Sequence, residues 1–278
     1  MLAAITCFFN PCHWKNREHN LRMFRERFSG CPLVIIELSL DNTFVYDDSI
    51  HIQAIESNDW IWHKERLLNI AESRLPDHVT KIAWIDADIV FDNRNWAVET
   101  SKALDSFGIV QPWEHCRSLN PDYSASAVFD SLGGKGDHDL RKYHCGFAWA
   151  ARREMFPIYD RSIYGGGDTV TSCWANGVEP PQNYLLDAEA AAIYRTRVEA
   201  VSCGTIGCVP GTIRHLYHGK RVNRRYSKRH KEFAELPFGF YDDIVTTENG
   251  LFGWAETVNA QVAKRWCRDY LRSRAEDN

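Results

Sequence analysis

The sequence has no CxxC pair, no apolar run long enough to cross a bilayer, and no internal repeat or low-complexity tract. A membrane-spanning helix needs about 20 consecutive apolar residues. The opening run Leu2–Phe9 is far shorter, lacks the flanks of a secretion signal, and reads instead as a first strand. Nine cysteines without metal-site spacing fit reduced thiols better than a disulfide framework or a zinc site. We therefore expect a cytoplasmic protein without a membrane-spanning segment.

Apolar strands and amphipathic helices alternate through residues 1–113. The expected strands are Leu2–Phe9, Leu33–Leu38, Ser49–Ile55, Ile82–Ile85 and Gly108–Trp113, and the expected helices are Arg17–Phe28, Trp62–Arg74 and Asn95–Ser106. Leu33–Leu38, which reads LVIIEL, is the kind of strand that helices cover on both faces. The alternation predicts an α/β fold with a mainly parallel sheet flanked by helices.

Residues 114–278 are less regular. The polar stretch Glu114–Lys142 contains SLGGKGDHDL and is expected to be a loop with little structure of its own. Further strands are expected at Cys145–Ala150 and Thr212–Tyr217, and helices at Val222–Glu235, at Thr257–Ser273 and in a short segment opened by Asp168. No linker divides the chain, so we expect residues 1–278 to form a single domain.

Three carboxylates follow the apolar strand in KIAWIDADIVFDN: Asp86, Asp88 and Asp92. An unpaired charge is costly to remove from water, and ligands of open α/β sheets bind beyond the carboxyl ends of the strands. A divalent cation is one reason to place two such acids at a strand end, because hard cations take oxygen ligands. The alternative is that Asp86 caps a turn and Asp88 is solvated.

The stretch IDADIVF resembles the DxD motif of metal-dependent nucleotide-sugar glycosyltransferases with the GT-A fold, a Rossmann-like fold. Four more segments follow the order that such enzymes use: WHKERLLN before the motif, then YHCGFAWAARREMF, GGGD and HLYHG after it. The resemblance implies a nucleotide-sugar-binding half in residues 1–113 and an acceptor-facing half with C-terminal helices in residues 114–278. It implies transfer of a sugar, such as a hexose, from a nucleoside-diphosphate sugar, with UDP favoured, to an acceptor hydroxyl.

The resemblance also assigns residues. A Mn²⁺ or Mg²⁺ ion bridging the donor diphosphate acts as a Lewis acid for the leaving group. Asp88 is its expected direct ligand, Asp86 reaches the ribose or the ion through water, and a histidine completes the set. The expected donor-binding residues are Asn10, Lys64, Asn69, Asp86, Gly166, Gly167, Lys220 and Arg224.

Two histidines, His215 and His218, compete for the metal. If Thr212–His218 is extended throughout, their side chains point to opposite faces. His215 lies nearer the apolar strand and is narrowly favoured, while His218 adjoins Gly219, where the chain can turn close to phosphate. Both remain candidates, and each could instead only bond its neighbours.

Asp168 follows three glycines and is the candidate catalytic base. A reaction that inverts the anomeric carbon needs a carboxylate to accept the proton of the acceptor hydroxyl, and inversion is the favoured outcome. The competing interpretation is a simple helix N-cap. Glu179 and Asp187 are weaker candidates for the base, and a retaining reaction would need none.

The stretch KRVNRRYSKRHK, residues 220–231, holds seven Lys or Arg and no acid. On a helix these form stripes, which a solvated face also explains. Its first part, Lys220 with Arg224 or Arg225, would face the donor diphosphate, and the rest would attract an anionic acceptor such as a glycan or modified DNA. Of Trp113, Trp149 and Trp174, we expect at most one to contact sugar, and we expect Trp149 to be packed.

Two other functions fit parts of the sequence. DADIV also matches the nucleophile motif of haloacid-dehalogenase-type phosphohydrolases, but that motif normally lies on the first strand of the chain, and about eighty residues precede it here. The second alternative is a non-catalytic nucleotide-sugar or nucleic-acid binding protein that has kept the fold.

Overall fold

A mixed α/β sheet forms the centre of the structure, a computed structural model that describes residues 1–135 and 139–278. Its strands, in spatial order, are β11 (Gly207–Cys208), β6 (Ile109–Gln111), β10 (Ala148–Arg152), β4 (Lys81–Ile85), β1 (Leu2–Phe9), β2 (Leu33–Ser39) and β3 (Ile50–Gln53). Every neighbouring pair is parallel except those of β10, which runs antiparallel to β4 and β6. The prediction of a mainly parallel sheet is confirmed.

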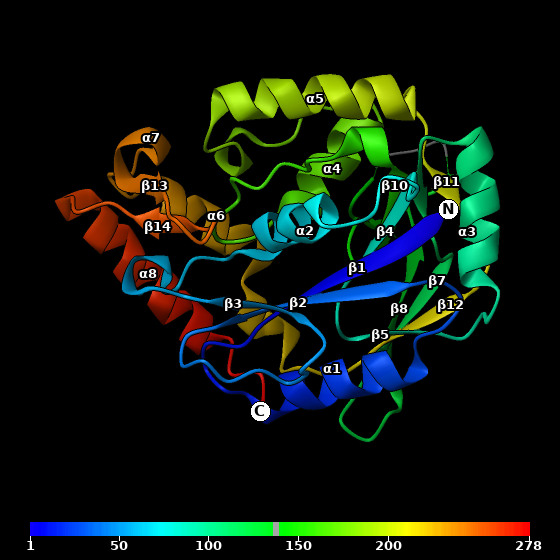
Figure 1. The fold of residues 1–278 in the computed structure, drawn as a ribbon, viewed down its shortest axis with the longest axis horizontal. Helices are drawn as coiled ribbons and strands as arrows, with labels where there is room; N and C mark the ends of the chain where they lie inside the picture. Colours follow the sequence, from blue (N-terminus) through cyan, green and yellow to red (C-terminus); the bar gives the residue numbers. More distant parts are fainter. Residues whose placement is uncertain (136–138) are drawn as a thin grey trace.

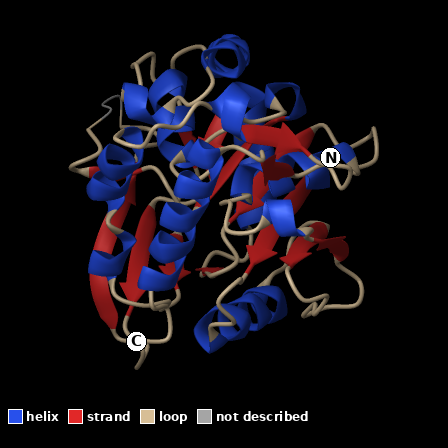
Figure 2. Cartoon of the chain, turned by 90° about the vertical axis from the view of Figure 1, so that its left-hand side faces the viewer, coloured by secondary structure: helices blue, strands red, loops and turns tan. Residues whose placement is uncertain are grey.

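Helices cover both faces of this sheet, as Figure 1 shows and the turned view of Figure 2 repeats. On one face lie α2 (Lys64–Ser73), α4 (Gly167–Ala175) and α5 (Ala188–Ser202), and on the other lie α1 (Lys15–Arg27) and α3 (Trp96–Ser106). Strand β1 alternates between the two cores: Ala3 and Ile5 pack on the α2 side, and Leu2, Ala4 and Phe8 on the α1 side. Because both faces are covered, its apolar run is continuous.

A second sheet occupies much of the stretch that the sequence suggests is a loop. It contains β5 (Ile89–Phe91), β12 (Thr212–His215), β7 (His115–Leu119), β8 (Ala125–Ser131) and β9 (Tyr143–His144) in that order. The expectation of an unstructured Glu114–Lys142 is therefore wrong over β7 and β8, although residues 136–138 lie outside the described part. Most side chains of β8 are partly or fully exposed, so its sequence lacks an apolar signature.

The C-terminal elements build a third core around Phe233, Trp254 and Cys267. They are α6 (Tyr226–Ala234), α7 (Phe240–Asp243), the hairpin of β13 (Ile244–Thr246) and β14 (Phe252–Trp254), and α8 (Val258–Ser273). Short 3₁₀ turns complete the elements: η1 (Glu56–Asn58), η2 (Arg153–Met155), η3 (Gln182–Tyr184) and η4 (Arg221–Arg224). None of the helices in the described residues has the length and apolar character that crossing a membrane requires.

The expected continuous helix Val222–Glu235 is wrong, because the chain turns at Arg225. That residue has φ +48° and separates η4 from α6. The break changes the side-chain directions, so the predicted basic stripes do not form. Arg224 and Arg229 are buried, while Arg225 and Lys228 pair with Glu232.

Candidate active site

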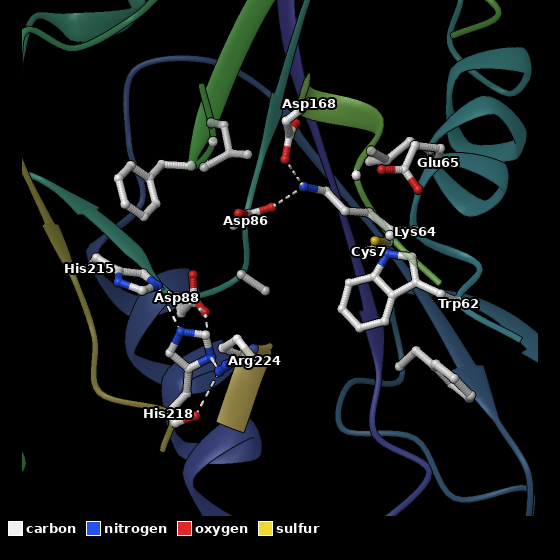
Figure 3. Close-up of a pocket in the computed structure, with 18 of the residues that line it drawn as sticks. Cys7, Trp62, Lys64, Glu65, Asp86, Asp88, Asp168, His215, His218 and Arg224 are labelled. Atoms are coloured by element: carbon white, nitrogen blue, oxygen red, sulfur yellow. Dashed lines mark hydrogen bonds and ion pairs between the residues drawn. The ribbon is translucent and has the colours of Figure 1, made fainter. Parts of the chain in front are cut away.

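A cavity of about 250 Å³ opens beyond the carboxyl ends of β1 and β4. Its acids and histidines come mainly from the start of α2, the turn after β4, the start of α4 and the end of β12 with the loop after it, and its arginines come from α1, η4, α6 and the segment after α8. Figure 3 shows the labelled side chains converging on this space. The cavity therefore lies at the edge of the sheet where the sequence places the acids and where α/β proteins bind ligands.

Asp88, His215 and His218 meet on one side of the cavity, with one candidate ligand atom from each residue inside a 4.8 Å span. Asp88 Oδ2 lies 3.8 Å from His215 Nε2 and 3.5 Å from His218 Nδ1. Strand pairing causes the approach: β12 runs antiparallel to β5, and His215 stands opposite Ile89, the residue after Asp88.

Both histidines face the same space, because the chain is not extended throughout Thr212–His218, the condition under which opposite faces were expected. Strand β12 ends at His215 rather than continuing to His218, and the loop then turns toward Gly219, which has φ +92°. The Nε2 atoms of the two rings lie 2.8 Å apart. Both histidines thus lie beside Asp88, and metal binding by either of them stays a prediction.

The electrostatics of this group suit a divalent cation. Burial, followed by the charge of Asp86, raises the pKa of Asp88 to about 7. Burial, followed by the charge of Arg224, lowers the pKa of His215 to about 4 and that of His218 well below its ordinary value. The buried Asp88 Oδ1 has no hydrogen-bond partner among the residues that the structure describes. Neutral imidazoles beside a carboxylate with an unpartnered oxygen fit Mn²⁺ by donor type.

Three arginine side chains lie near the cluster of Asp88, His215 and His218. Arg17, Arg224 and Arg274 each pair with the fully buried Glu276, at 3.0, 3.1 and 2.6 Å. Arg224 also donates to the backbone oxygen of His218 at 2.7 Å and contacts its ring. Three guanidinium groups around one carboxylate leave excess positive charge, and all three arginines line the cavity. The neighbourhood therefore suits an anionic ligand.

Lys64, the first residue of α2, bridges two acids. Its Nζ lies 2.6 Å from Asp86 Oδ1 and 3.0 Å from Asp168 Oδ2, as the dashed lines of Figure 3 show. Burial lowers the pKa of Lys64, but the charges of Asp168 and Asp86 outweigh it and raise that pKa well above its ordinary value. Asp86 is thus held by a lysine and lies outside the cluster of Asp88 with the two histidines.

Asp168 enters the cavity instead of capping its helix. The N-cap of α4 is Gly166, no side chain caps the helix, and Asp168 accepts from Lys64. Gly165 and Gly166 have φ +91° and +115°, a backbone that favours glycine. The N-cap interpretation is wrong, and the carboxyl group is left available for chemistry. Burial raises its pKa, although Lys64 opposes the shift.

Comparison with known proteins finds only distant structural similarity. No protein-family model and no curated protein matches the sequence. Among solved structures, Staphylococcus aureus TarS is 8% identical, with a TM-score of 0.43 over 98% of this chain and 71% of that one. A mutant of Drosophila β-1,4-galactosyltransferase 7 with manganese, UDP-Gal and xylobiose is 14% identical, with a TM-score of 0.43 over 96% of this chain and 98% of that one. Mannosyl-3-phosphoglycerate synthase from Rubrobacter xylanophilus is 13% identical, with a TM-score of 0.42 over 94% and 88%. Likeness at this level identifies neither donor nor acceptor for this chain.

Several predicted donor-binding residues lie elsewhere. Asn69 is buried against the Asp160 segment, where it donates to Ile158 O at 2.9 Å and accepts from Ile158 N at 2.8 Å, so its role is structural. Lys220 is exposed and does not line the cavity. Gly167 packs against the side chain of Glu65, whereas Gly166 lines the cavity.

Asn10 borders a neighbouring cavity of about 120 Å³, which it shares with Phe8, Phe9, Asp41 and Phe44 at the ends of β1 and β2. Its side chain donates to Trp14 O at 2.9 Å and accepts from Trp14 N at 3.0 Å. Donor binding by Asn10 stays a prediction; Phe8 and Phe9 line both this cavity and the main one, so the two cavities adjoin.

The tryptophans divide between core and cavity. Trp113, Trp149 and Trp174 are buried, so the expected packing of Trp149 is confirmed and none of the three lines the cavity. Trp62 does line it, with the guanidinium of Arg274 4.6 Å from its ring centre. Trp62 lies just before α2, and Phe8, Phe9, Phe147 and Tyr226 add further aromatic lining, so aromatic side chains from both halves of the chain face the cavity.

Glu65 is a titratable group whose burial the sequence did not reveal. It lines the cavity beside Lys64, is 4% exposed, and its Oε2 has no hydrogen-bond partner in the described part of the chain. Burial raises its pKa from 4.5 to about 8, although Lys64 lowers it. The amphipathic pattern of α2 marks only apolar positions and gives no sign of a charge turned inward.

Glu65→Gln should stabilise the protein progressively as pH rises. Between pH 4.5 and 8 the folded wild type retains a proton on Glu65 that the unfolded chain loses, so wild-type stability falls with pH across this window. Glutamine does not titrate, so the free energy of unfolding of the variant does not fall in this way. The difference is about 1.4 kcal/mol per unit of pKa shift. Urea denaturation at pH 5 and pH 8 measures it, with the exposed Glu26→Gln as control. A gain equal at both pH values would contradict the burial assignment.

Proposed function

We propose that this chain is a glycosyltransferase that moves a sugar, such as a hexose, from a nucleoside-diphosphate sugar, with UDP favoured, to an acceptor hydroxyl with inversion. The observation that carries the proposal is the meeting of Asp88, His215 and His218 in the same cavity as Asp168. One side of that cavity offers ligands for a divalent cation, and the other offers a carboxylate suited to accept a proton.

Each residue has a role in this proposal. Asp88, His215 and His218 would hold Mn²⁺ or Mg²⁺, which when bound neutralises charge on the leaving diphosphate. Arg224 would donate to diphosphate oxygens. Asp168 would take the proton of the attacking hydroxyl, and Lys64 would keep that carboxylate oriented. Asp86 would accept a hydrogen bond from a ribose hydroxyl of the donor.

The melting temperature of the protein tests the proposal directly. UDP, UDP-glucose and UDP-galactose should raise it only when Mn²⁺ is present, because a ligand that binds the folded state at 100 times its Kd adds about 2.7 kcal/mol. For a chain of this size that corresponds to a shift of about 5 °C or more. Uridine with Mn²⁺ is the control and should shift it little, since it lacks the diphosphate.

An equal shift in EDTA would contradict a metal-bound diphosphate. Release of phosphate from p-nitrophenyl phosphate without any response to UDP would favour the phosphohydrolase alternative. A shift produced only by DNA would favour nucleic-acid binding.

A further inference from the structure

Arg229 on α6 is a buried cation whose hydrogen-bond partners, among residues 1–135 and 139–278, are all neutral. It is 8% exposed and lines the cavity. Its Nη1 donates to Tyr270 Oη at 2.6 Å, its Nε to His230 Nε2 at 3.3 Å, and its guanidinium lies 5.3 Å from the ring centre of Tyr226. Burial, together with Arg229 itself, lowers the pKa of His230 to about 3, so that imidazole carries no charge at neutral pH.

Neighbouring arginines are paired differently. Arg17, Arg224 and Arg274 share the carboxylate of Glu276, and Arg225 pairs with Glu232. Within the described residues, no carboxylate forms an ion pair with Arg229. A buried charge without a counter-ion is costly, and the cost falls when a ligand supplies the opposite charge. The site therefore suits an anion that arrives from solution.

The position of Arg229 links this anion to the proposed base. A Cβ on Gly165 would lie 3.2 Å from Arg229 Nη2 and 3.6 Å from Trp62 Nε1, so the missing side chain leaves the guanidinium close to the glycine loop. That loop leads to Asp168 within three residues. Burial raises the pKa of Asp168, and the charge of Arg229 is among the smaller effects that oppose this rise, which places both groups in one electrostatic neighbourhood.

The proposed donor diphosphate would have partners other than Arg229. Arg224 and Arg17 adjoin His218 and Asp88, whereas Arg229 adjoins the loop of Asp168. We propose that the acceptor carries a phosphate or carboxylate group, which Arg229 binds while the acceptor hydroxyl faces Asp168. This inference rests on the proposed function and narrows its acceptor to an anionic, hydroxyl-bearing molecule. A planar guanidinium holds such groups through two parallel hydrogen bonds.

Titration of the full chain with sn-glycerol 3-phosphate and with glycerol, followed by NMR in the presence of UDP and Mn²⁺, tests the inference. UDP and Mn²⁺ occupy the diphosphate site, so the probe reports on the second anion site. We expect glycerol 3-phosphate to bind the wild type and glycerol not to bind. Arg229→Gln should weaken glycerol 3-phosphate binding at least tenfold while changing UDP affinity less than twofold, and Arg229→Lys should retain part of it.

Arg224→Gln is the matched control, since it removes one guanidinium from the other side of the same cavity. It should weaken UDP at least tenfold and leave glycerol 3-phosphate within twofold. Absence of glycerol 3-phosphate binding to the wild type, or a loss of UDP affinity in Arg229→Gln, would overturn the inference. Failure of UDP to bind the wild type would instead reject the proposed function, and the two variants would still be compared with glycerol 3-phosphate alone. Circular dichroism confirms that each variant is folded.

Discussion

Asp88→Ala is expected to lower metal-dependent sugar transfer by about three orders of magnitude, because a cation at the leaving group contributes several kcal/mol of transition-state stabilisation. Asp88 supplies the carboxylate of the proposed cation site, and the two neutral imidazoles left behind would hold a hard cation poorly. Rates of UDP release from UDP-sugar across a Mn²⁺ titration measure the effect. The residual activity should no longer respond to Mn²⁺.

The same substitution, Asp88→Ala, should not lower the thermal stability of the metal-free protein. Asp88 Oδ1 is buried without a partner, and burial raises the pKa of the carboxyl to about 7. Removing the group relieves that desolvation cost, so metal-free Asp88→Ala should melt no lower than the wild type. Asp92→Ala is the matched control: Asp92 directly follows β5 and pairs with Arg214 at 2.8 Å near the surface. Full metal-dependent activity in Asp88→Ala, or equal losses in both variants, would show that Asp88 does not bind the metal.

The central sheet was predictable because burial on both faces leaves a direct mark on sequence. Strands such as β2, with LVIIEL, need apolar residues at consecutive positions, so their existence and their parallel pairing follow from composition and alternation with helices. The second sheet was not predictable on that basis. Strand β8 is partly exposed along most of its length and carries polar residues, so its pairing with β7 leaves no such mark.

The candidate site was predictable in its residue types and less so in its contacts. Asp88, both histidines, Lys64 and Asp168 were expected from the sequence, and they line one cavity. Their grouping depends on the pairing of β12 with β5 and on where β12 ends, which are long-range features. The two ion pairs of Lys64, with Asp86 and with Asp168, are also long-range, so the sequence around Lys64 does not indicate them.

The prediction of one continuous basic helix over Val222–Glu235 was wrong for a related reason. A left-handed residue in a helical pattern is normally marked by glycine, but here the turn is made by Arg225 at φ +48°. Without that break, Arg224 and Arg229 would lie on helix faces set by a regular 3.6-residue period. The turn instead directs both into the cavity, where each has a proposed anionic partner. A stretch that looks like a solvated or nucleic-acid-binding face thus contributes two buried cations to the site.

Asp168→Asn is expected to lower the turnover number by about 10²–10⁴, the usual range for loss of a general base. Asparagine keeps the shape of the side chain but cannot accept the acceptor proton, so affinity for UDP with Mn²⁺ should change less than twofold. Burial raises the pKa of Asp168. The activity of the wild type should therefore fall, as the pH is lowered, at a pH above the pKa of an ordinary aspartate, and the variant should not show this fall.

Glu179→Gln is the control, because Glu179 is exposed and pairs with Arg195 at 2.5 Å. Asp187, the other alternative, caps α5 by accepting from Ala190 N at 3.0 Å, which makes it structural. A turnover number in Asp168→Asn within threefold of the wild type would mean that no carboxylate at this position accepts the proton, and would favour a retaining reaction.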